Sequence, residues 1–147
     1  METLKSKLPL IVRTLLGLVF FVFGLNGFLH FLPQPPLPGR AGEFIGALIG
    51  TGYLFTLVKA VEVSAGALLL AGRFVPLAIT LLAPIVVNIV MFHLVLAPGG
   101  YPMLAFLVGA ELFLAWSYRT SFAPMLRGDA KPVLAEVKRA SVTVAAE

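Results

Sequence analysis

The sequence contains no cysteine, and only 12% of its 147 residues are charged. Without cysteine there can be no disulfide, no thiolate metal site, no cysteine-ligated iron–sulfur cluster and no redox mechanism based on paired thiols. The formal net charge is +4, but the basic residues are too scattered to form a surface that binds nucleic acid. We therefore expect neither a nucleic-acid partner nor a metal site.

Apolar residues make up 59% of the chain, and the mean hydropathy is +0.99. This apolar content exceeds what a soluble domain of the same length can bury. Four apolar blocks approach the length of about 20 residues that a helix needs to cross a bilayer. Because backbone polar groups must be paired inside lipid, we predict an all-α integral membrane four-helix bundle. Its predicted spans are residues 8–30, 53–72, 75–96 and 102–118.

The positive charges predict the orientation of this bundle. They lie before or early in the first span, in the turn between the second and third spans, and after the last span. The positive-inside rule then places both termini in the cytoplasm of a multi-pass protein of the bacterial inner membrane. We assign residues 1–126 to the membrane domain and 127–147 to a cytoplasmic tail. The charges in question are Lys5, Lys7, Arg13, Arg73, Arg119, Arg127, Lys131, Lys138 and Arg139.

The segment between the first two spans has a character of its own. A proline-rich stretch ends at Pro38, and residues 41–50 carry apolar side chains on one face, which predicts a short amphipathic half-helix. Gly42, Gly46 and Gly50 recur at four-residue spacing. Small residues at this spacing predict a close approach to a neighbouring helix.

Polar side chains inside the spans are the candidates for function, because an ionisable group in a membrane helix costs about 2.5–3.5 kcal/mol. Counting along the helices predicts that polar groups from separate spans gather around one cavity in the outer half of the bundle. The predicted ligand-binding set is Asn26, Lys59, Glu62, Asn88 and His93, with His30 and Glu111 as secondary candidates and no catalytic residue assigned.

Each of these residues also has a purely structural interpretation. Lys59 and Glu62 have the i,i+3 spacing of a pair that neutralises itself, and an asparagine can simply bond a neighbouring helix. Asn88 and His93 lie about 140° apart on their helix. We therefore predict that both reach one cavity only if the helix bends, and Pro84 is the expected cause of the bend.

Several motifs follow one another along the chain, namely residues 24–28 (GLNGF), 53–62 (YLFTLVKAVE), 66–78 (GALLLAGRFVPLA), 83–93 (APIVVNIVMFH), 118–119 (YR) and 122–124 (FAP). Together they resemble bacterial DoxX-like membrane proteins, over residues 15–126. Glu111 and the residues that follow it also fit the last span of that family. The resemblance implies association with membrane redox or oxidative-stress complexes, while distant eukaryotic relatives serve as cargo receptors or assembly chaperones.

These observations favour a protein that binds a small amphiphile, with a quinone as the expected ligand, within a membrane redox assembly. It would be at most a quinone-interacting subunit, with no covalently bound cofactor, and a partner subunit would supply electrons. Glu62 or His93 would exchange protons with the quinone, and Asn88 and Lys59 would donate hydrogen bonds. The expected partners are the lipid bilayer, that redox subunit and a second copy of the chain. The alternatives are a non-enzymatic assembly or cargo factor and, less favoured, a proton-coupled transporter using Glu62 and Glu111.

Overall fold

The computed structural model describes residues 2–129, and every regular element in that range is helical. The chain divides into two compact units, one ending at Ser117 and the other beginning at Tyr118. The predicted tail begins later, at residue 127, and most of it lies outside the described residues. The elements are α1 (Glu2–Leu29), α2 (Gly39–Gly50), α3 (Leu54–Ala71), α4 (Val75–Val95), α5 (Tyr101–Ser117), α6 (Arg119–Phe122) and the 3₁₀ helix η1 (Ala123–Leu126).

Three of these helices are long and apolar enough to cross a membrane, namely α1 from Lys7 onward, α3 and α4. A fourth is added if α5 and the short helices after it count as one span. This indicates a membrane protein. Helices α3 and α4 begin and end within one residue of the predicted ranges, whereas α1 begins at Glu2, well before the predicted residue 8.

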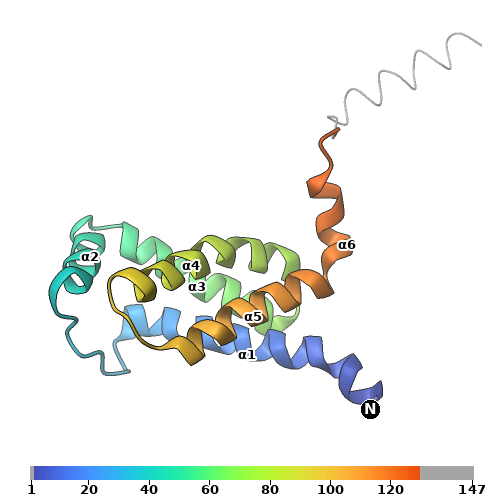
Figure 1. Cartoon of the computed structure of the whole chain (residues 1–147), viewed down its shortest axis with the longest axis horizontal. Coiled ribbons are helices and arrows are strands. Elements are labelled where there is room, and N and C mark those ends of the chain that lie inside the picture. Colours follow the sequence, from blue (N-terminus) through green and yellow to red (C-terminus); the bar gives the residue numbers. More distant parts are fainter. Residues whose placement is uncertain (1, 130–147) are drawn as a thin grey trace, which may run out of the picture. The chain divides into compact units, whose positions relative to one another are not determined.

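The four long helices pack in a closed order. Helix α1 contacts α3 and α5, and α4 contacts the same two helices (Figure 1). Each contributes one leucine with no exposed surface, and these side chains form the centre of the core: Leu16, Leu69, Leu82 and Leu114. Because all four helices share this core, side chains of α1, α3, α4 and α5 can line common cavities.

The closest helix contact is between α1 and α3, and glycines make it possible. A Cβ atom at Gly24 would lie 2.9 Å from the main-chain nitrogen of Val63, and one at Gly66 would lie 2.9 Å from the main-chain oxygen of Gly17. Both distances are shorter than a real Cβ contact. The α1–α3 crossing therefore depends on residues without side chains, as close-packed membrane helices do.

The predicted glycine contact of α2 is wrong. A Cβ atom at Gly46 or Gly50 would have nothing within 4 Å, and both residues are exposed. Gly42 faces the main-chain carbonyl of Leu37, in the segment that leads into α2, and not another helix. The reason is that α2 turns its apolar residues, not its glycines, toward the long helices.

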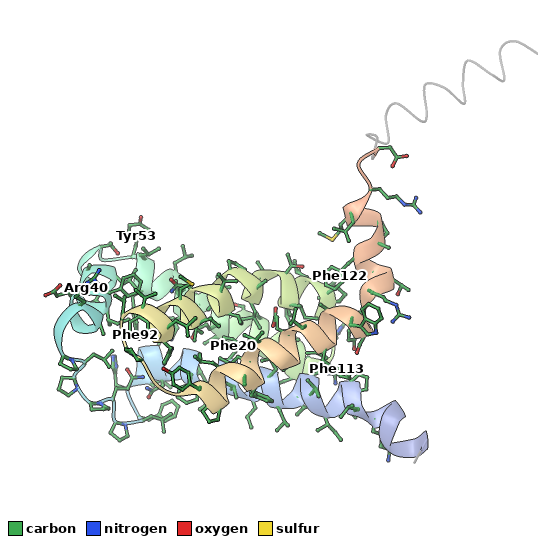
Figure 2. The ribbon with its side chains drawn as sticks, in the orientation of Figure 1. Phe20, Arg40, Tyr53, Phe92, Phe113 and Phe122 are labelled. Atoms are coloured by element: carbon green, nitrogen blue, oxygen red, sulfur yellow. The ribbon has the colours of Figure 1, made fainter. Side chains whose placement is uncertain are left out.

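Helix α2 covers one end of the long helices, called here the α2 end (Figure 1). It packs on α3, and its Phe44 ring lies 5.8 Å from the ring of Phe92 near the end of α4. Phe92 is labelled at this end in Figure 2, and Phe20 of α1 lies farther along the long helices. The α2 end holds most of the polar residues that the sequence singles out.

Candidate functional site

The centre of the site is an ion pair on α3. The Lys59 ammonium donates to Glu62 Oε2 over 2.7 Å, as the i,i+3 spacing predicts. Glu62 is buried, and the side chain of Lys59 is 19% exposed. The ammonium also lies 5.6 Å from the centre of the Phe55 ring, which adds a cation–π contact. Two ammonium protons and Glu62 Oε1 have no bond within the described residues, so both partners can still bind a ligand.

Glycines of α1 position this pair. A Cβ atom at Gly27 would overlap the Lys59 side chain, and one at Gly24 would lie 3.0 Å from the Glu62 Cβ. Both side chains therefore pass over the glycine surface of α1, and a larger residue there would displace them. The motif at residues 24–28 contains both glycines, but their contact with Lys59 could not be derived without the crossing of α1 and α3.

A small cavity of about 130 Å³ lies between the ion pair and α2. Helix α2 forms its roof with Phe44, Ile45 and Leu48, and α3 and α4 form its walls. Its polar lining residues are Lys59, Glu62, Asn88 and His93. Four of the five residues predicted to bind a ligand therefore lie around one cavity.

A second cavity of about 280 Å³ adjoins the same ion pair on the side of α1 and α5. Its polar residues are Lys59, Glu62 and His93, and the rest of its lining is apolar. These apolar residues are Val19, Phe20, Phe23, Ile89, Met103 and Leu107. The density of phenylalanines in the first span is the one sequence feature that points to the lining of this cavity. Met103 and Leu107 could not be predicted to line it, because hydrophobicity alone does not distinguish them from other residues of the span.

His93 has a defined hydrogen bond. Its Nδ1 lies 2.9 Å from the main-chain oxygen of Ile89, one turn earlier in α4. A carbonyl oxygen can only accept a hydrogen bond, so Nδ1 carries the proton and Nε2 of the neutral ring is an acceptor. The ring also packs edge-on against Phe92, with 5.3 Å between the ring centres. His93 thus presents an unbonded acceptor at the wall shared by the two cavities.

The predicted bend of α4 at Pro84 does not interrupt the helix. Helix α4 is one continuous helix from Val75 to Val95, across Pro84. The bond to Ile89 holds the His93 ring back along the helix toward the preceding turn. Asn88 is exposed at the edge of the small cavity, and its side chain forms no hydrogen bond with residues 2–129. Asn88 and the His93 ring therefore both line the small cavity.

Asn26 lines neither cavity. It is 2% exposed, its Oδ1 accepts a 2.6 Å hydrogen bond from the Leu32 N–H, and its Nδ2 donates to the Leu32 oxygen over 3.4 Å. These bonds hold the segment after α1 against the end of that helix. The Asn26 amide therefore already has main-chain partners. The structural interpretation is the one that fits Asn26.

The two secondary candidates lie elsewhere. His30 is exposed just after α1, with a left-handed φ of 52°. Glu111 is buried on α5 and borders a groove between α4 and α5 that shares no residue with the two cavities. Among residues 2–129, no three His, Asp or Glu side chains come together as a metal site would require.

Comparison with known proteins adds no relative from which a function could be transferred. No protein-family model, curated protein or solved structure matches the chain. The functional argument therefore rests on the geometry of the site.

Proposed function

We propose that the protein binds a small amphiphile whose polar head contacts the Lys59–Glu62 pair and whose apolar part occupies the larger cavity. The observation that carries this proposal is the shared wall of the two cavities, where Lys59, Glu62 and His93 line both. Such a site has a few convergent polar groups in an otherwise apolar lining, as small-molecule sites generally do.

A quinone is the ligand class that best matches these groups. The Lys59 ammonium has protons left to donate to a carbonyl oxygen, and Glu62 Oε1 and His93 Nε2 can accept a proton from a hydroxyl group. The same site can therefore bind both forms of the head group. Lys59 donates a hydrogen bond to the oxidised form, and Glu62 and His93 accept hydrogen bonds from the reduced form. When bound, the quinone would supply the two-electron chemistry, and a partner subunit of a membrane redox assembly would exchange the electrons.

This function agrees with the membrane location and topology that the sequence predicts. We place it as a four-span bundle in the bacterial inner membrane with cytoplasmic termini, as a member of the DoxX-like family. A quinone dissolved in the bilayer would then reach the larger cavity from the hydrocarbon phase, and α2 would cover the polar head. Support for this arrangement comes from the apolar helices and from the position of α2 over the ion pair.

The test is a titration of the purified full chain in nanodiscs with a short-chain ubiquinol analogue, the reduced form, whose hydroxyl groups can donate to Glu62. We expect saturable binding that Glu62→Gln weakens about tenfold or more, because a buried charged acceptor is lost. Glu43→Gln is the matched control, because Glu43 is exposed on α2 and lines neither cavity. An absence of saturable binding to the wild-type protein, or equal affinity in the two variants, would reject the proposal.

A second candidate function is that of a non-enzymatic assembly or cargo factor. The observation in its favour is the open glycine surface of α2, where Gly46 and Gly50 have no neighbour within 4 Å. A membrane helix of a partner could approach this surface closely. Replacing Gly46 with Trp should then abolish assembly with that partner while leaving quinone binding intact, which separates the two functions.

A further inference from the structure

Glu111 is a buried acid without a bonding partner. The residue is 7% exposed, and neither carboxyl oxygen has a hydrogen-bond partner among the described residues. A buried charge normally has a counter-ion or several donors, because desolvation is otherwise too costly. Nothing in the proposed quinone site uses this carboxyl group, since Glu111 lines neither of its cavities.

The groove beside Glu111 is wholly apolar apart from that residue. It has a volume of about 290 Å³ and lies between α4 and α5. Its outer edge is accessible, because Val87 is 62% exposed and Leu112 is 65% exposed. The remaining lining residues are Ala83, Val86, Val90, Met91 and Val108. The groove thus faces outward from two membrane-type helices, with a carboxyl group beneath its surface.

No charged group of the helices packed against α5 forms a hydrogen bond with the Glu111 carboxyl group, within the described residues. Helix α5 packs on α1 and α4, whose ionisable side chains, where described, are Lys7, Arg13 and His93, and Lys7 is exposed near the start of α1. His93 lines the two cavities at the α2 end, and Arg13 lies against Gly72 after the end of α3. Neither bonds to Glu111. Within the described residues, no hydrogen bond or ion pair therefore compensates the negative charge when it is present, and Arg13 Nε is likewise buried without a hydrogen-bond partner.

We propose that this groove is a second binding site, selective for lipophilic monovalent cations such as quaternary ammonium or phosphonium compounds. The argument is charge complementarity inside an apolar groove. Both Glu111 oxygens are buried and the other lining residues are apolar, so a primary ammonium in the groove would lack acceptors for its directed hydrogen bonds. A cation shielded by its own apolar groups needs no such bonds, and the low-dielectric surroundings strengthen its attraction to the carboxylate.

Proton balance makes binding dependent on pH. The neutral acid holds one proton, and that proton must leave to the solvent before the carboxylate can attract a cation. On the acid side of the Glu111 titration, the apparent affinity should fall about tenfold for each unit of pH, as one-proton linkage requires. Arg13 and His93 make no contact with the carboxyl group, so a single proton should account for the whole slope.

The experiment measures binding of tetraphenylphosphonium to the full chain in nanodiscs, with empty nanodiscs subtracted. We expect saturable binding that Glu111→Gln weakens about tenfold or more, since the substitution removes the charge and keeps the shape. Glu111→Asp keeps the charge and should retain most of the affinity. Glu43→Gln is the matched control and should bind like the wild type, because Glu43 is exposed on α2 and does not line the groove. Triphenylphosphine oxide, a neutral probe, should not distinguish wild type from Glu111→Gln.

Four outcomes would overturn the proposal. They are no saturable binding to the wild type, equal affinity in Glu111→Gln, affinity independent of pH, and loss of binding in Glu62→Gln but not in Glu111→Gln. The last would place the cation at the ion pair. A single cysteine, Val87→Cys, tests the rival occupant, because the chain has no other cysteine. Disulfide-linked dimers in this variant, without cation binding, would assign the groove to a second copy of the chain.

Discussion

Gly66 of α3 lies directly against the main chain of Phe21 in α1, and a Cβ atom at Gly66 would be 2.6 Å from the Phe21 nitrogen. The neighbouring atoms belong to the backbone, so they cannot move away as a flexible side chain could. This contact fixes the distance between α1 and α3, and with it the position of the Lys59–Glu62 pair, which lies one to two turns earlier in α3. The candidate site is therefore built on the closest helix crossing of the molecule.

Gly66→Ala is expected to lower the free energy of unfolding by about 1–3 kcal/mol, as overpacking of a tight interface does. Gly46→Ala is the matched control, because a Cβ at that position has nothing within 4 Å. It should leave stability unchanged or raise it by about 0.5–1 kcal/mol, since alanine is the better helix former. Far-UV circular dichroism during unfolding in mixed micelles measures both. Equal effects of the two substitutions would show that α1 and α3 do not pack through glycine.

Removing one partner of the ion pair should cost more than removing both. Lys59→Met leaves a buried carboxylate without its cation and is expected to lower the free energy of unfolding by about 3 kcal/mol. The double variant Lys59→Met/Glu62→Leu should recover part of that loss, because no buried charge remains. Unfolding of the wild type, both single variants and the double variant gives the coupling energy. Strict additivity would mean that the two charges do not interact.

The pair and most of its neighbours could be predicted from the sequence because helix geometry relates them. Lys59 and Glu62 differ by three positions on one helix, and depth along the helices places Asn88 at about the level of Lys59. The same count places His93 nearer the outer rim. Asn26 met the same criteria of depth and polarity. Its partner, however, is the main chain at Leu32, and the path of the chain after a helix has no periodicity from which to predict it.

The glycine contacts illustrate a second limit. The regular spacing of Gly42, Gly46 and Gly50 satisfies the small-residue pattern, yet Gly46 and Gly50 have no neighbour there. The glycines that make close contacts between helices lie on two different helices, with Gly17, Gly24 and Gly27 on α1 and Gly66 on α3. Which faces of two helices meet depends on the packing of the whole core, and a pattern within one helix cannot specify it.

Asn26 and Asn88 should respond in opposite ways to replacement by leucine. Asn26→Leu leaves the Leu32 N–H and carbonyl without their partners, so the free energy of unfolding should fall by about 1–3 kcal/mol. Asn88→Leu removes an exposed amide that forms no hydrogen bond, so stability should be kept. The effects on quinone affinity should be the opposite: Asn88→Leu should bind the quinone more weakly than the wild type, and Asn26→Leu should bind it equally well. A loss of affinity in a still-folded Asn26→Leu protein would return Asn26 to the ligand set.

A substitution of His93 can change ligand affinity without changing stability, because the two ring nitrogens form different interactions. Nδ1 bonds to Ile89 and holds the ring in place, while Nε2 is left as the acceptor toward the cavities. His93→Asn keeps a side-chain N–H near the position of Nδ1 and deletes Nε2, so stability should be kept and affinity for the reduced quinone should fall about tenfold, the value of one lost hydrogen bond. The oxidised form has no hydroxyl group to donate to Nε2, and its affinity should be nearly unchanged. Separate titrations of the two forms decide the matter: equal losses for both would mean that His93 shapes the cavity without accepting a hydrogen bond from the ligand.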